Sequence, residues 1–225
     1  AVILTVRVVH SRGMLSLLGV QPSTVRQMIK VTGAVLALFA AIELLPPYWS
    51  SDGMEIADGL NWLLLLPVSV AALTIQISAE EILYRGYVQQ QIAARFSSPL
   101  IWLIVPNLLF AAAHWDGTAP LTEAVQYTIW AFCFGLAASD LTARTGSLAA
   151  ALGFHLANNM YAFLLFGDTG ANDSGLALFV FTMPEAAALP PDPTAELTPW
   201  LSGAFVTELS IVFLMWLAAR LAVRR

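Results

Sequence analysis

Two adjacent carboxylates and an arginine lie inside one of the most apolar stretches of this chain. Glu80 and Glu81 follow the apolar run 61–78, and Arg85 comes four residues after Glu81. In a helix, neighbouring residues point about 100° apart, whereas residues four apart share a face. Glu81 and Arg85 are therefore expected to form an ion pair. We interpret Glu80, which has no obvious local partner, as the working carboxylate and Glu81–Arg85 as its structural support.

Three further polar residues occur where an apolar helix would not be expected to carry them: His114, His155 and Asn159. His155 and Asn159 are four residues apart, so they share a helix face. Glu80 lies as far before the expected turn at Ser97 as His114 lies after it. Because helix rise per residue is constant, an antiparallel hairpin brings both to one level. Three helices can thus converge on one polar cavity within the inner half of a membrane.

Such a set of side chains has the chemistry of a hydrolytic site. A carboxylate beside an imidazole can activate water as a general base. A second imidazole with a carboxamide can stabilise an oxyanion. Together they suit hydrolysis of an amide bond without a covalent intermediate. The same donors, Glu80, His114 and His155, could instead hold Zn²⁺, and residue types alone do not choose between the two.

The composition predicts an integral membrane protein with an all-α fold. Of the 225 residues, 58% are hydrophobic and 11% are charged, whereas soluble domains are about 45–50% apolar and about 25% charged. A single cysteine, Cys133, excludes a disulfide framework and a cysteine-based metal cluster. We expect membrane lipid around the chain and no nucleic-acid partner.

The pattern of apolar runs predicts a helix bundle with about six transmembrane helices plus short interfacial helices, in a single domain over 1–225. The first 30 residues are expected at the cytoplasmic surface, with a helix starting at Pro22-Ser23. The segments 49–60 and 167–198 are expected as acidic loops, with 176–183 lying in the interface or dipping into the membrane. The expected spans are 31–45 (ended by Pro46-Pro47), 61–78 (continuing to about residue 95), 100–115, 121–141, 147–166 and 200–223. With six spans, all Lys and Arg fall on one side, which predicts that both termini are cytoplasmic.

Three motifs in the core 60–165 resemble those of a known family. Glu80-Glu81-x-x-x-Arg85, Phe110-x-x-x-His114 and His155-x-x-x-Asn159 are similar, in order and interval, to those of the CPBP family. These are the CAAX-processing and bacteriocin-processing intramembrane proteases, also called the type II CAAX prenyl endopeptidase or Abi family.

This resemblance implies an all-helical intramembrane endopeptidase. The composition, in which arginine dominates the basic residues and alanine and leucine are abundant, favours a bacterial plasma membrane. The resemblance implies that Glu80 and His114 activate the water, that His155 and Asn159 stabilise the oxyanion, and that Glu81 and Arg85 support them. A metal-free mechanism is the leading expectation, with Zn²⁺ as the alternative cofactor. The implied substrate is a peptide or protein, either prenylated or a bacteriocin-like precursor.

Other interpretations of the same residues are open. His155 with Asn159 could join helices by hydrogen bonds, Asn158 competes with Asn159 as the functional amide, and Asn107 and Gln76 read as packing or cavity-lining groups. Intramembrane Glu and His residues also occur in transporters and proton relays. A catalytically silent protein that binds a membrane partner, as an immunity protein does, is the other alternative.

Overall fold

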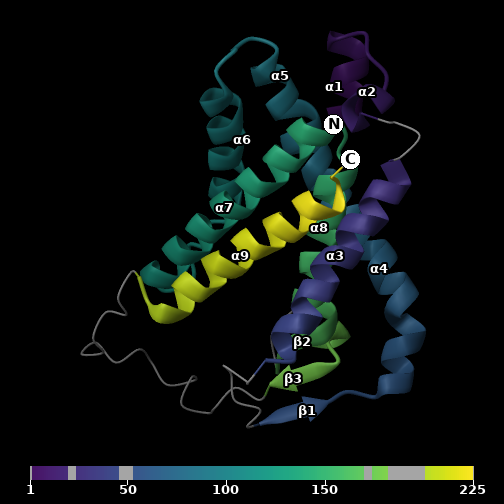
Figure 1. The fold of residues 1–225 in the computed structure, drawn as a ribbon, viewed down its shortest axis with the longest axis vertical. Helices are drawn as coiled ribbons and strands as arrows, with labels where there is room; N and C mark the ends of the chain where they lie inside the picture. The colour runs from purple at the N-terminus through teal and green to yellow at the C-terminus, as the bar shows by residue number, and fades with distance from the viewer. Residues whose placement is uncertain (1, 20–23, 46–52, 170–173, 182–200, 225) are drawn as a thin grey trace.

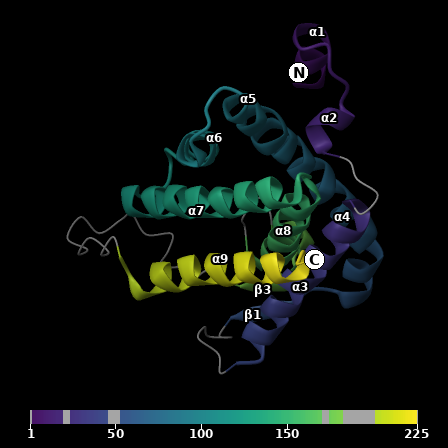
Figure 2. The same ribbon diagram turned by 45° about the horizontal axis from the view of Figure 1, so that its top comes forward.

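The fold is a helix bundle with one small sheet (Figures 1 and 2). The computed structural model describes residues 2–19, 24–45, 53–169, 174–181 and 201–224. The α-helices are α1 (Val2–Val9), α2 (Leu15–Leu18), α3 (Thr24–Glu43), α4 (Gly59–Glu81), α5 (Gln90–Ala93), α6 (Pro99–Ala113), α7 (Leu121–Thr145), α8 (Ala149–Met160) and α9 (Gly203–Ala222). Two π-helical segments, η1 (Ile82–Gln89) and η2 (Tyr161–Leu165), continue α4 and α8, and η3 (Ser174–Leu176) is a 3₁₀ turn. The strands are β1 (Met54–Ile56), β2 (Phe166–Asp168) and β3 (Phe179–Phe181).

The all-α membrane class predicted from composition is confirmed. Three helices of the described chain are long and apolar enough to cross a membrane: α3, the continuous helix Gly59–Ala93, and α9. The helix α6 is apolar but shorter. The count of six spans stays a prediction. The expected helix start at Pro22-Ser23 and the expected stop at Pro46-Pro47 lie outside the described residues.

The helix that carries the two glutamates is longer than a membrane requires. From Gly59 to Ala93 it has 35 residues, or roughly 50 Å at 1.5 Å per residue, where about 20 residues suffice for a span. Asp58 caps its start, since its carboxylate accepts a hydrogen bond from the Leu60 N–H at 3.0 Å. The α5 end extends toward the same end of the molecule as α1 and α2 (Figure 1). The predicted continuation of this helix beyond the apolar run is confirmed.

Helix α8 forms the centre of the bundle and is packed by α3, α4 and α7. Nine of its twelve residues are buried, and its small side chains let neighbouring helices approach closely. At Gly153 an added Cβ would lie 2.5 Å from the Met28 carbonyl oxygen of α3. Helices α7 and α9 lie side by side and close the other face (Figures 1 and 2). This packing fixes the position of His155 and Asn159 in the middle of the bundle.

A three-stranded sheet in the order β1-β3-β2 corrects two loop predictions. Strand β3 pairs antiparallel with β1 and parallel with β2. The expected loop 49–60 contains β1, and the segment 176–183, expected to lie in the interface or dip in, contributes β3 up to residue 181; residues 182–183 lie outside the described residues. Phe166 stacks on Phe179, with ring centroids 5.6 Å apart. Strands of three residues are too short for an alternating pattern, so no periodic signal predicts them.

Candidate active site

The four residues expected to do chemistry line one cavity of about 440 Å³. Glu80 comes from the end of α4, His114 follows α6, and His155 and Asn159 come from α8. The prediction that Glu80 and His114 lie at one level is therefore consistent with the structure. The other lining residues are Gln76, Phe110, Tyr127, Trp130, Phe134, Asn158, Ala162, Phe163 and Glu208.

The predicted ion pair between Glu81 and Arg85 is present and fully buried. Arg85 Nη1 donates to Glu81 Oε1 at 3.0 Å, and both side chains are 0% exposed. The same carboxylate oxygen lies 2.8 Å from His155 Nδ1. A carboxylate only accepts, so this contact places the proton of His155 on Nδ1. Glu81 therefore has a second role that its spacing did not predict, because it orients the imidazole of His155.

Glu80 differs from its neighbour in having no hydrogen-bond partner within the described chain. Its side chain is 27% exposed, and its Oε2 lies 3.9 Å from His155 Nε2. This distance is too long for a direct hydrogen bond and leaves room for a shared water. Glu80 Oε2 is itself buried and unpartnered among the described residues. The arrangement is thus an open carboxylate facing the free nitrogen of an anchored imidazole.

His114 and Asn159 each form one side-chain hydrogen bond and keep another polar group without a bond to the described residues. His114 Nδ1 lies 2.7 Å from the Phe110 carbonyl oxygen, which can only accept, so Nδ1 carries the proton and Nε2 is the free nitrogen. Asn158 Nδ2 donates to Asn159 Oδ1 at 3.2 Å. This bond leaves the amide N–H groups of Asn159 available as donors toward the cavity.

Behind Glu81 and His155 lies a buried polar network that sequence reasoning missed. Arg85 Nη2 donates to Asn107 Oδ1 at 3.3 Å and to the Gly135 carbonyl at 3.2 Å. Asn107 Nδ2 donates to Ser139 Oγ at 2.9 Å, and Gln89 Nε2 donates to the Ser139 carbonyl at 3.2 Å. The network joins η1, α6 and α7 and fixes the guanidinium of Arg85. The sequence indicates only a packing or cavity-lining role for Asn107, because nothing near it in the chain indicates its partner Arg85, 22 residues away.

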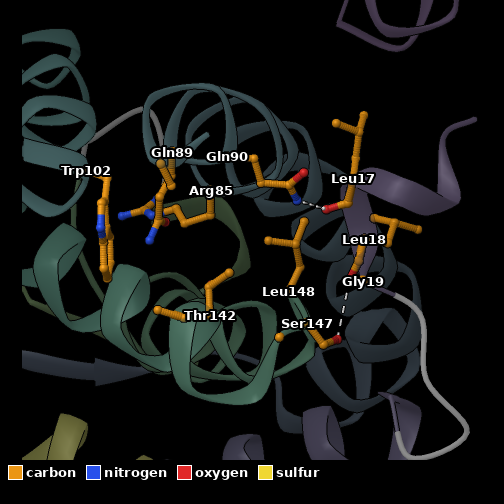
Figure 3. A pocket seen from close by; sticks show the side chains of 13 residues that line it. Leu17, Leu18, Gly19, Arg85, Gln89, Gln90, Trp102, Thr142, Ser147 and Leu148 are labelled. Atoms are coloured by element: carbon orange, nitrogen blue, oxygen red, sulfur yellow. Dashed lines mark hydrogen bonds between the residues drawn. The ribbon is translucent and has the colours of Figure 1, made fainter. Parts of the chain in front are cut away.

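A second cavity, of about 240 Å³, lies on the other side of this network (Figure 3). Figure 3 shows Arg85, Gln89 and Trp102 on one side of it and Leu17 and Leu18 of α2 on the other. Among the described residues, Arg85 Nε and Gln89 Oε1 are buried without a hydrogen-bond partner, and both residues line this cavity. Ordered water in a cavity of this size can satisfy both groups. The N-terminal segment thus covers the back of the network.

The arrangement was tested as a metal site. Within the described residues, no three His, Cys, Asp or Glu side chains are grouped closely enough to hold a metal ion. Glu80, His114 and His155 converge on one cavity, but as they stand they do not form a metal centre. The zinc alternative stays a prediction.

The fold defines a helical integral membrane protein, and its buried polar cluster has the composition of a hydrolytic site. Residues 61–161 match the model of the type II CAAX prenyl endopeptidase Rce1-like family. This segment contains Glu80, His114, His155 and Asn159, and the resemblance seen in the three motifs is confirmed for residues 61–161.

A curated relative gives a second comparison. The chain is 28% identical over 152 residues, or 66% of its length, to the uncharacterized protein YyaK of Bacillus subtilis (strain 168). The chain spans about half the length of this relative, with 51% of it covered. No solved structure matches the chain.

Proposed function

We propose that this protein is an intramembrane endopeptidase that hydrolyses a peptide bond near the cytoplasmic side of the membrane. One observation carries the proposal. In an apolar helix bundle, the unpartnered Oε2 of Glu80 faces the free Nε2 of His155 across 3.9 Å. An uncompensated carboxylate in such surroundings is costly, so its persistence favours a role in chemistry. The match to a protease family supports the class of reaction.

In the proposed reaction a water molecule binds between Glu80 and His155. Glu80 takes a proton from the water as its oxygen attacks the carbonyl carbon of the peptide bond. The amide N–H groups of Asn159 donate to the developing oxyanion. Glu80 then returns the proton to the leaving nitrogen as the C–N bond breaks. The water thus supplies the hydroxyl of the new carboxyl group and the hydrogen of the new amine.

The contacts favour a division of roles between the histidines that differs from the family expectation. His155 is the imidazole near the Glu80 carboxylate, and the described residues show no ion pair between Glu80 and His114. We propose that His155 Nε2 orients the water with Glu80, and that His114 assists Asn159 on the oxyanion side of the same cavity. Glu81 and Arg85 act as positioning residues, because they hold the ring of His155.

The substrate class follows from the family, and the orientation follows from charge. We propose a peptide or protein substrate, either prenylated or a bacteriocin-like precursor, and a bacterial plasma membrane with both termini cytoplasmic. Arg144, Arg220 and Arg224 gather around one cavity at the ends of α7 and α9. The sheet, with Glu55 and Asp168, lies toward the opposite end of the molecule (Figure 1). A basic cytoplasmic end agrees with the bias of Lys and Arg in membrane proteins.

The proposal is tested by cleavage of a reporter peptide library with purified protein, with and without a chelator. Glu80→Gln is the matched control because it keeps the shape of the side chain and removes its basicity. We expect cleavage that survives chelation and falls by roughly 10²–10⁴-fold in Glu80→Gln, the range of general-base contributions. Loss on chelation that zinc restores would assign Glu80, His114 and His155 as ligands. Absence of cleavage under every condition would favour the silent, partner-binding alternative.

A further inference from the structure

A second large cavity adjoins the catalytic one and shares part of its wall. This adjoining cavity has a volume of about 560 Å³ and is lined by residues of α3, α7, η2, α8 and α9. Trp130, Asn158 and Glu208 line both cavities. The two spaces are therefore neighbours across one shared wall. A peptide segment that reaches Glu80 from the adjoining cavity would therefore pass this shared wall.

Glu208 is the acidic group at the junction of these two cavities. It lies in the first half of α9, and its side chain is exposed. Its neighbours in the adjoining cavity include the aliphatic side chains of Ile211, Val212 and Met215. Within the described chain it forms no salt bridge. An unpaired carboxylate in such surroundings is costly unless a cation approaches it.

The carboxylates that line this junction face no Lys or Arg side chain in either cavity. Neither cavity is lined by Lys or Arg, and the basic groups present are the catalytic-cavity imidazoles His114 and His155. Glu80 is the second carboxylate of the catalytic cavity. Glu43, which lies nearby at the end of α3, accepts a hydrogen bond from the Tyr161 hydroxyl. Because no described Lys or Arg lines either cavity, none of them competes with an incoming cation for Glu208.

We infer that Glu208 is a specificity-determining residue that binds a positively charged side chain of the peptide substrate where it enters the catalytic cavity. This inference rests on the proposed function and adds a substrate class to it: apolar segments with a lysine or arginine close to the scissile bond. The aliphatic wall receives the apolar part of the segment, and the carboxylate pairs with its cation. Complementary charge at a recognition surface mainly determines specificity.

The test uses short apolar host peptides that carry one Lys, Gln or Glu at successive positions on either side of the cleaved bond. For the wild type we expect kcat/KM to be about tenfold higher for Lys than for Glu at one position, which corresponds to about 1.4 kcal/mol. Glu208→Gln should remove this preference, and Glu208→Lys should reverse it. The matched control is Ser210→Ala on the same helix, since Ser210 is exposed, lines neither cavity and bonds to its own helix at Val206.

Binding of the same peptides to the Glu80→Gln protein gives a readout that does not require cleavage. We expect the Lys peptide to bind more tightly than the Glu peptide, and Glu208→Gln introduced into that protein to equalise them. Equal binding before that change, or an unchanged preference after it, overturns the inference. Failure of the wild type to cleave any peptide would overturn the proposed function instead, and a binding preference that depends on Glu208 would then still assign the site.

Discussion

The proposed catalytic cavity and the network behind it use the same kinds of polar side chain in opposite ways. Glu81, in the network, is 0% exposed and is bonded to both Arg85 and His155. Glu80, its neighbour in sequence, faces the cavity with a buried oxygen that has no hydrogen-bond partner in the described chain. Only the direction of the side chain, set by the helix, separates the two environments.

This difference indicates how the bundle can keep an unpartnered carboxylate beside a buried ion pair. The network pairs Glu81 with Arg85, and its hydrogen bonds join three segments of the chain. The cavity leaves one polar group of each catalytic candidate free, and the network orients His155 toward it. Changes in the network should therefore reduce stability and activity together, whereas changes at Glu80 should reduce activity alone.

The largest effect on stability is expected for Arg85→Ala. It leaves the Glu81 carboxylate buried without its cation, and breaking a buried pair from one side costs about 3–5 kcal/mol. Thermal unfolding in detergent measures the loss, and cleavage should fall in parallel because His155 loses its anchored partner. The matched control is Arg144→Ala, since Arg144 has the same four-residue spacing from Asp140 but is 49% exposed. The control should lose under about 1 kcal/mol of unfolding free energy. Equal losses in both variants would contradict a supporting role for the buried Glu81–Arg85 pair.

A smaller loss is expected for Gly135→Ala, which inserts a methyl group into the network. Its Cβ would lie 2.5 Å from Asn107 Oδ1 and 3.1 Å from Arg85 Nη2. Overpacking of this kind costs about 1–3 kcal/mol, and thermal unfolding measures it. Gly33→Ala in α3 is the control, because nothing lies within 4 Å of the added Cβ, and there the change should stabilise by about 0.5–1 kcal/mol. Stabilisation at both sites would contradict the tight packing described around Arg85.

The smallest effect is expected for Ser139→Ala. The change removes the acceptor of the Asn107 Nδ2 bond, but Asn107 keeps its 2.6 Å bond to the Leu103 carbonyl. The net contribution of one such bond is about 1 kcal/mol, so the unfolding temperature should fall slightly while cleavage persists. A loss as large as that of Arg85→Ala would show that Ser139, rather than the ion pair, dominates the network.

The sequence was informative wherever spacing along one helix determines a contact. The four-residue interval predicted the Glu81–Arg85 pair, and equal distances from one turn predicted that Glu80 and His114 lie at one level, where they line one cavity. It was uninformative for contacts between segments far apart in the chain. The bond from His155 to Glu81 spans 74 residues, and that from Asn107 to Ser139 spans 32. Neither leaves a local pattern, and the three-residue strands are likewise specified by pairing rather than by periodicity.

The most direct test of the account compares Glu80→Gln with Glu81→Gln. Both changes remove one charge and preserve shape, and the two residues are adjacent. Cleavage of a reporter peptide and thermal unfolding in detergent are measured for each protein. The account predicts that Glu80→Gln abolishes cleavage with an unchanged unfolding temperature, and that Glu81→Gln lowers both. A Glu80→Gln protein that cleaves normally, or one that unfolds as early as Glu81→Gln, would contradict the separation of a working carboxylate from a supporting one.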